Sequence, residues 1–152
     1  MFKLKRGQKS LFSASTLLPE GKRRRLERTW AWAFRTGALP LIDENLFRHL
    51  YHGDNGRPNK PVQTVIGLLL LKDMWDLTDE EILFNLDFNL AYQVTLDVDP
   101  DEAHCCQKTL HNFRAKLMAS EADELVFRSL TDRILAVLDV DIGKQRLDST
   151  HT

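Results

Sequence analysis

Apolar residues dominate one stretch near the middle of the chain, from Pro61 to Trp75, with the sequence PVQTVIGLLLLKDMW. Its polar side chains form only a narrow strip, made of Gln63, Thr64, Lys72 and Asp73. A helix that is apolar nearly all round is normally buried in the middle of a domain. Because the uninterrupted apolar run is far shorter than the roughly 20 residues that cross a bilayer, the pattern predicts a core helix and no membrane span.

Helical spacing of apolar residues recurs on both sides of this stretch. It predicts an amphipathic helix over residues 19–35, with Leu26, Trp30 and Phe34 on one stripe. Further helices are expected over residues 43–52, 79–87, 91–96, 107–119 and 120–138. For four of these helices we predict an inner face. For 43–52 it is Leu46 and Leu50, with Phe47 as a further candidate, and for 79–87 it is Ile82, Leu83 and Leu86. For 107–119 it is Cys106, Leu110, Phe113 and Leu117, and for 120–138 it is Val126, Leu130, Ile134 and Val137.

Polar residues mark where two of these helices begin. Thr78 and Glu81 have the spacing of a capping box, in which each side chain bonds to the other residue's backbone N–H. Ser120 and Asp123 have a similar spacing at the start of the last helix. A short break is expected near Asn89. These signals place the helix boundaries more firmly than apolar periodicity alone.

The patterns together predict an all-α fold, a multi-helix domain. We expect a disordered basic tail over residues 1–18, a helical domain over 19–138, and a linker over 139–152 that leads into a first β-strand. The strand would begin in the segment 145–148, only a few residues before the chain ends, where it has no partner strand. This pattern suggests a second domain interrupted at its first strand.

Composition narrows the class of protein. The 152 residues are 43% hydrophobic and 28% charged, which is typical of a soluble globular domain with a real core. The basic N-terminus lacks the apolar segment of a signal peptide. The two cysteines are adjacent and make no disulfide framework, so we expect a cytoplasmic protein.

Charge is distributed unevenly along the chain. Residues 1–36 contain ten Lys and Arg against two Glu, whereas the remaining residues contain eleven basic and twenty acidic side chains. A basic arm on an acidic body favours a polyanion partner such as DNA. The candidate phosphate contacts are Arg23, Arg24, Arg25 and Arg28. The alternative interpretation is an arm that folds onto the acidic body.

The predicted helix over residues 107–119 has the most informative surface. Its outer face carries Lys108, His111, Asn112, Arg114 and Lys116. Lys and Arg reach phosphates, while Asn and Arg contact base edges from a helix in the major groove. We therefore predict DNA contacts here. A solvated face without a partner is the alternative interpretation.

The same helix could complete a helix-turn-helix-like element with the helices over 61–75 and 79–87. In that motif a second helix enters the major groove while the first crosses the backbone. The connection over residues 89–106 is much longer than the usual turn, so the motif is imperfect.

Other candidate chemistry is limited. His104, Cys105, Cys106 and His111 do not have the spacing of a zinc site, and we predict none. Asp148 would lie at the end of the predicted strand, where a carboxylate could bind a divalent metal. One carboxylate alone makes no enzyme.

Three segments taken together resemble bacterial insertion-sequence transposases of the DDE class. They are GRPNKPVQTVIGLLLLKDMWDLTDEEILFNLDFNLAYQVTL, KTLHNFRAKL and the closing RLDSTHT. The markers are Tyr51, the Gly56-Arg57-Pro58 turn before the apolar helix, the Leu-Thr-Asp-Glu-Glu restart, the helix that contains Phe113-Arg114, and the final Asp-Ser-Thr. The resemblance covers about residues 38–152.

This resemblance implies a helical DNA-binding region ahead of an RNase H-like catalytic domain. The region would recognise double-stranded DNA at the terminal inverted repeats, in the bacterial cytoplasm at the nucleoid. Asp148 matches the first catalytic and metal-binding carboxylate of a triad that holds two Mg²⁺ ions for phosphodiester chemistry. The other two are missing, so we expect neither catalysis nor Mg²⁺ binding from these residues alone. The resemblance allows a homodimer and implies no small-molecule substrate.

Two other functions are compatible with the same residues. One is a truncated transposase that regulates transposition by binding DNA without cutting it. The other is a helical protein–protein interaction domain whose arginines fold onto its own acidic body. DNA binding that falls steeply with salt would count against the second, because phosphate contacts release counterions.

Overall fold

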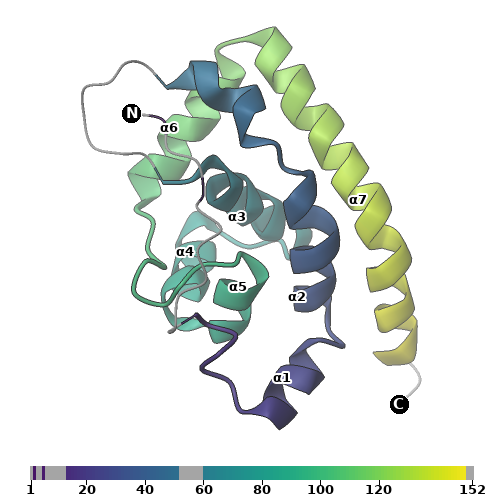
Figure 1. Ribbon diagram of the computed structural model, residues 1–152. Coiled ribbons are helices and arrows are strands. Elements are labelled where there is room, and N and C mark those ends of the chain that lie inside the picture. The colour runs from purple at the N-terminus through teal and green to yellow at the C-terminus, as the bar shows by residue number, and fades with distance from the viewer. Residues whose placement is uncertain (1, 3–4, 6–12, 52–59, 150–152) are drawn as a thin grey trace.

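The computed structural model describes Phe2, Lys5 and residues 13–51 and 60–149, with side chains described up to Leu138. All regular elements in these ranges are helices, which confirms the predicted all-α class (Figure 1). None of the described helices combines the length and apolar composition that a bilayer crossing needs.

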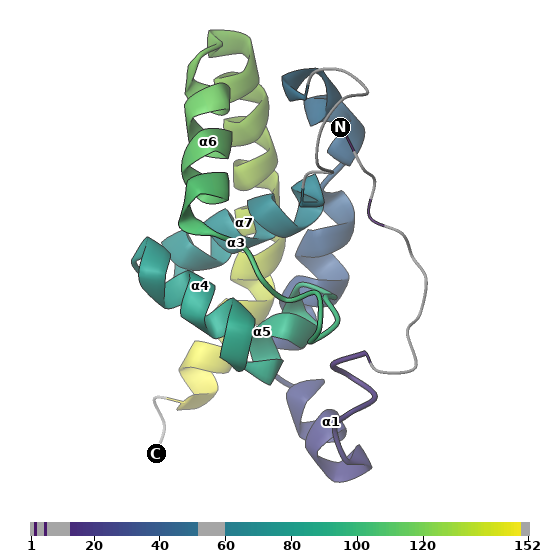
Figure 2. The ribbon, with the colours of Figure 1, turned by 90° about the vertical axis from the view of Figure 1, so that its left-hand side faces the viewer.

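Helix α3, Val62–Met74, lies at the centre of the fold. Every residue from Thr64 to Leu71 is buried, as the apolar pattern predicts. Figures 1 and 2 show the other helices around it, with α4, Asp79–Phe88, and α6, Gln107–Met118, on one side. These three helices contact one another, so the predicted helix-turn-helix-like trio is brought together.

Gly67 allows a close approach at the middle of α3. A Cβ atom at this position would lie 2.5 Å from Cδ2 of Leu96, which directly follows α5, Leu90–Thr95. That distance is well inside van der Waals contact, and Leu96 is fully buried. Glycine is therefore the residue that lets α5 pack directly onto α3.

Helices α3 and α5 end in the same way, with an aspartate in the left-handed conformation. Asp76 has φ 51° and Asp97 has φ 52°. Past α3, the N–H of Leu77 donates to the carbonyl of Lys72 at 2.9 Å, and equivalent bonds follow Asp97. This is the Schellman pattern, in which glycine is the usual left-handed residue.

The start of α4 confirms the predicted capping box. The Thr78 hydroxyl accepts from the N–H of Glu81 at 3.1 Å, and the Glu81 carboxylate accepts from the N–H of Thr78 at 2.7 Å. Asn89 separates α4 from α5, as predicted, and its side chain caps α5 by accepting from the N–H of Ala91.

The helix predicted over residues 19–35 is instead two helices and a π-helical turn. These elements are α1, Glu20–Leu26; α2, Trp30–Ala33; and η1, Phe34–Ala38. At the break, the Thr29 hydroxyl donates to the carbonyl of Leu26 at 2.6 Å and so satisfies a backbone group at the end of α1. The predicted stripe is otherwise retained: Trp30 packs edge-on against Trp75 and Phe34 is buried.

Two short 3₁₀ helices connect η1 to α3. They are η2, Leu39–Leu41, and η3, Glu44–Leu50. We predicted Leu46 to face inward, but it is 48% exposed, while Glu44, Phe47 and Leu50 are buried. The buried residues are spaced by three because a 3₁₀ helix has three residues per turn. The prediction was therefore right for Leu50 and for the further candidate Phe47, and wrong for Leu46, which an α-helical spacing places on the same face as Leu50.

Helix α7, Glu121–Ser149, runs along one side of the molecule and packs against α2, η1 and α6 (Figure 1). Leu130, Ile134 and Leu138 are buried. Val126 and Val137, which we also predicted to be buried, are 38% and 41% exposed. The inner stripe turns away from them along the helix.

The predicted end of this last helix, near Leu138, is wrong, because α7 continues to Ser149. The segment 145–148, where we predicted a strand to begin, lies within this helix. Local helical hydrogen bonds satisfy the backbone of this segment, and the described ranges contain no strand with which it could pair. Whether the segment forms a strand beside a sheet stays a prediction.

Candidate nucleic-acid interface

Helix α6 separates its buried and exposed residues cleanly. The side chains of Leu110, Phe113 and Leu117 are buried. Four of the predicted contact residues are exposed on the opposite side: Lys108, His111, Asn112 and Lys116. The structure thus brings these four together on one solvent-facing surface, which we call the α6 outer face.

Arg114, the fifth predicted contact residue of α6, is held by α4. Its guanidinium donates two hydrogen bonds to the Asp79 carboxylate, at 2.8 and 2.5 Å. These bonds, together with Lys72 at 3.8 Å, hold the pKa of Asp79 below its ordinary value. The bidentate pair fixes α6 against the first residue of α4. Arg114 therefore positions the helix.

Lys116 is oriented by an aromatic ring. Its Nζ lies 4.5 Å from the ring centre of Tyr51, which follows η3. A cation over a ring face is attracted by the ring quadrupole. The ammonium group nevertheless remains on the exposed side of α6.

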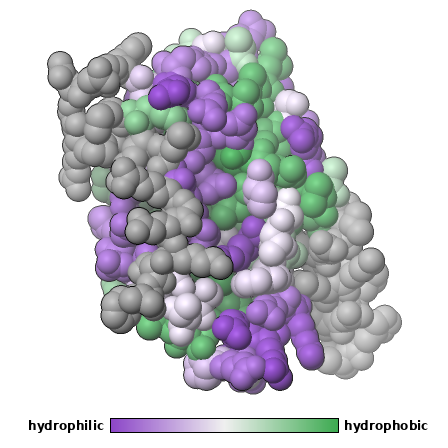
Figure 3. All heavy atoms as spheres, viewed as in Figure 1, coloured by the Kyte–Doolittle hydropathy of each residue, from purple (hydrophilic) through white to green (hydrophobic). Residues whose placement is uncertain are grey.

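The arginines of α1 have a different setting. No residue of α1 is buried. Arg23 pairs with Glu27 at 3.8 Å and Arg24 with Glu20 at 2.5 Å, so their ion pairs lie within or next to their own helix. Arg25 and Arg28 are also exposed. Figure 3 shows hydrophilic side chains gathered at this end of the molecule.

Two other basic residues of the N-terminal region do fold onto the acidic body. The Lys5 ammonium donates to the carbonyl of Leu96 at 2.5 Å and lies 3.9 Å from Asp97. Arg35 pairs with the same aspartate at 2.9 Å. Burial lowers the pKa of Lys5. The basic residues of the N-terminal region therefore fall into two groups: Lys5 and Arg35 contact the acidic body, whereas the arginines from Arg23 to Arg28 are exposed.

The two adjacent cysteines lie in different environments, one buried and one exposed. Cys105 is buried, and burial raises the pKa of its thiol to about 11. Cys106, predicted to face inward, is exposed because it is the N-cap of α6 and precedes the helical periodicity. Its bond with the Thr109 hydroxyl lowers its thiol pKa. In the described part of the chain, no three His, Cys, Asp or Glu residues gather as metal ligands.

Asp148 lies near the end of α7, where side chains fall outside the described part of the structure. Its predicted catalytic and metal-binding role therefore stays a prediction.

Sequence reasoning missed the partner of Arg114, although a signal was present. Arg114 is four residues after Leu110 and three before Leu117, so it lies at the edge of the buried face. A charged residue in that position is well placed to bond to a neighbouring helix. The partner, Asp79, is 35 residues away along the chain and could not be read from local spacing.

Comparison with known proteins identifies a family. A family model described as "Transposase domain (DUF772)" matches residues 24–116, from α1 through most of α6. No curated protein and no solved structure matches the chain. The matched segment is more than half of the sequence and contains both the arginines of α1 from Arg24 onward and the α6 outer face. The chain therefore belongs to the DUF772 transposase-domain family.

Proposed function

We propose that this chain is the DNA-binding region of a DDE-class insertion-sequence transposase and that it recognises the element's terminal inverted repeats. The observation that carries the proposal is the α6 outer face, where Lys108, His111, Asn112 and Lys116 are exposed on a firmly anchored helix. Membership of a transposase family supports DNA as the partner.

The dimensions of α6 suit a duplex. Lys108 and Lys116 are eight residues apart, which corresponds to about 12 Å along a helix. The major groove is about 12 Å wide, so the two ammonium groups can reach phosphates on either side of it. His111 and Asn112 lie between them. An asparagine in that position can make two hydrogen bonds to an adenine edge.

The arginines of α1, and Arg28 just after it, would supply affinity without reading the sequence. Phosphate contacts fix a protein on the duplex but carry no base information directly. Arg23, Arg24, Arg25 and Arg28 need no fixed geometry for that role, because an exposed guanidinium can reach several phosphates. Catalysis would require Asp148 together with two further carboxylates and Mg²⁺.

The proposal is tested by fluorescence anisotropy with the terminal repeat and with a scrambled duplex, each at two salt concentrations. We expect tighter binding to the repeat and a steep loss of affinity with salt for both duplexes. Equal affinity for the two would remove sequence recognition from α6. An absence of binding to either would contradict the proposal as a whole.

A double variant, Lys108→Ala with Lys116→Ala, tests the α6 outer face directly. We expect affinity for the repeat to fall roughly tenfold or more, because two phosphate contacts are lost. Loss of the Lys116–Tyr51 contact should cost only about 0.5–1 kcal/mol of stability. A matched control removes two exposed arginines from α7, Arg128→Ala with Arg133→Ala. Unchanged affinity in a folded Lys108/Lys116 variant would contradict the assignment.

A further inference from the structure

Helix α4 exposes an aromatic pair that the fold does not use. Phe84 is 63% exposed and Phe88 is 74% exposed, with their ring centres 5.0 Å apart. The buried side of α4 is formed by Ile82 and Leu86 instead. Two large rings side by side in water are unfavourable, since each would gain free energy from burial.

Acidic and polar side chains border this pair. Glu80, Glu81 and Asn85 line a shallow surface depression together with Phe84. The Glu81 carboxylate is used in the capping box, but Glu80 makes no ion pair with any described residue. We call this surface the α4 aromatic face. It combines apolar bulk with an available negative charge.

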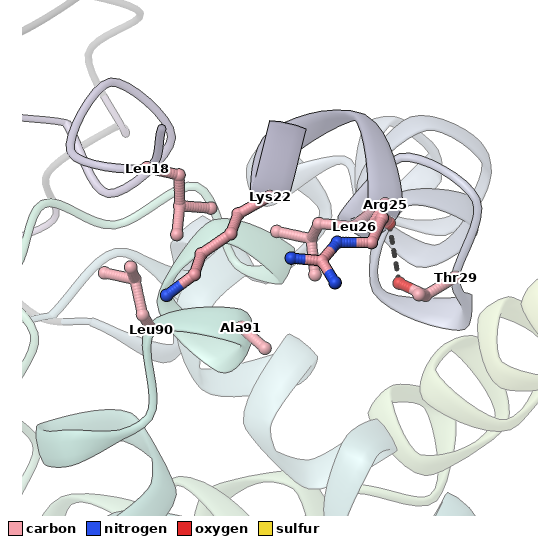
Figure 4. Close-up of a pocket in the computed structure, with 7 residues that line it drawn as sticks. All are labelled: Leu18, Lys22, Arg25, Leu26, Thr29, Leu90 and Ala91. Carbon is pink, nitrogen blue, oxygen red and sulfur yellow. Dashed lines mark hydrogen bonds between the residues drawn. The ribbon is translucent and has the colours of Figure 1, made fainter. Parts of the chain in front are cut away.

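A groove of complementary character lies between α1 and α5. It has a volume of about 390 Å³ and an apolar floor formed by Leu18, Leu26, Leu90 and Ala91. Figure 4 shows Leu18 and Leu90 turned toward each other, with the Lys22 side chain extending between this pair and Leu26. The polar members of its lining are Lys22, Arg25 and Thr29.

The two cations of this groove are not used in ion pairs among the described residues. Neither Lys22 nor Arg25 makes an ion pair with a described carboxylate, in contrast to the neighbouring Arg23 and Arg24. An occupant that brings both apolar groups and a carboxylate would satisfy the floor and the rim together. The α4 aromatic face has that chemistry.

The aromatic face and the groove also adjoin. Phe88 ends α4 and Leu90 begins α5, with only Asn89 between them. Figure 2 shows α4, α5 and α1 following one another across the molecule. In a two-fold interface, residue i of one copy meets residue j of the other, and the reverse holds at the same time. Adjoining complementary surfaces fit such a reciprocal contact.

We propose that the occupant is a second copy of this chain. Each copy places its Phe84–Phe88 pair in the groove between α1 and α5 of the other, and its Glu80 carboxylate opposes the Lys22 and Arg25 cations there. The rings remove the leucine side chains of the groove from water, and the charges set the orientation. This self-association needs no DNA and leaves the α6 outer face exposed. Of the arginines that we propose as phosphate contacts, it uses only Arg25.

Sedimentation velocity over a range of protein concentrations, without DNA, tests the proposal. We expect a dimer in the full chain and at least about tenfold weaker association, equivalent to ~1.4 kcal/mol, in Phe84→Ser with Phe88→Ser. The matched control is Met118→Ser with Leu125→Ser, which replaces apolar residues that are 74% and 56% exposed elsewhere. It should dimerise normally. A full chain that stays monomeric at every concentration, or a dimer that survives the phenylalanine changes, would overturn the proposal.

A charge exchange tests the reciprocal pairing independently of ring burial. Glu80→Lys alone, and Lys22→Glu with Arg25→Glu, should each weaken association because like charges then face one another. Combining all three changes should restore it, which a merely unfolded variant could not do. Circular dichroism confirms that each variant is helical. Association that stays lost in the combined, folded variant would overturn the pairing.

Discussion

Helices α1 and α6 both present basic side chains to solvent, but the protein holds them in opposite ways. Helix α6 buries Leu110, Phe113 and Leu117 and is tied to α4 by the bidentate Arg114–Asp79 pair. Helix α1 buries none of its residues, and its ion pairs lie within or next to its own helix. Figure 2 shows α1 at the far end of the molecule from most of α6.

This difference bears on what each helix can recognise. Hydrogen bonds to base edges require donors and acceptors in fixed positions. A helix held by buried residues and by an ion pair to its neighbour is suited to them. A charge that only needs to approach a phosphate tolerates motion of its helix. Anchoring, rather than the number of positive charges, would then separate sequence recognition from general affinity.

The largest difference between α6 and α1 is expected when a buried side chain is truncated in each helix. Phe113 is 2% exposed and its ring centre lies 6.3 Å from that of Phe47. Phe113→Ala should lower the free energy of unfolding by about 3–5 kcal/mol. Leu26→Ala in α1 should cost less than about 1 kcal/mol, because that side chain is only half-buried. Urea denaturation measures both, and similar costs would mean that α1 is anchored as firmly as α6.

The next largest effect is expected from removing the Arg114–Asp79 ion pair between α6 and α4. Arg114→Ala should cost about 2 kcal/mol, since it removes both hydrogen bonds to a partly buried carboxylate and leaves it only Lys72 at 3.8 Å. Arg24→Ala is the control, because its pair with Glu20 is exposed and should be worth about 0.3–0.5 kcal/mol. A loss for Arg114→Ala no larger than that of the control would contradict the anchoring role.

The same pair predicts a pH dependence of stability. Because Arg114 lowers the pKa of Asp79 in the folded state, the pair stabilises the protein above the carboxyl group's ordinary pKa, about 4. That contribution is lost as the pH falls through this value toward the lower pKa of the folded state. Arg114→Ala should therefore flatten the acid side of the stability profile. An unchanged profile would mean that other carboxylates dominate it.

The smallest predicted effect concerns salt. Replacing Arg23, Arg24 and Arg28 with Ala, three arginines outside the proposed self-association surface, should reduce the slope of log affinity against log salt by roughly 3. Binding to repeat and scrambled duplexes should weaken equally, because these contacts carry no base information. A selective loss for the repeat would assign sequence recognition to α1 and reverse the comparison.

The elements that depend on local patterns could be predicted from the sequence. The central helix α3 follows from apolar composition, and the start of α4 follows from the Thr78–Glu81 spacing. The exposed residues of α6 follow from its periodicity, because a regular helix between two clear ends fixes which side chains share a face. These features need only the residues within a few turns.

The rest depends on distant contacts or on departures from regular geometry. In η3 the burial of Leu50 was predicted correctly, but Leu46 was wrong and Glu44 was missed, because the 3₁₀ geometry changes the spacing of buried positions. The roles of Arg114 and Lys5 depend on partners 35 and 91 residues away. The predicted end of α7 was wrong because the backbone of residues 145–148 can form either local helical or inter-strand hydrogen bonds.

The aspartates that end α3 and α5, Asp76 and Asp97, have the same left-handed backbone conformation. We nevertheless expect the two positions to tolerate substitution differently. At position 76 the side chain is exposed, so a random library should enrich glycine, which adopts this conformation without steric cost. At position 97 the same replacement would remove the carboxylate that holds Arg35 and Lys5. Glycine can therefore increase stability at position 76. At position 97 the contacts with Lys5 and Arg35 favour aspartate, although glycine fits the left-handed backbone better.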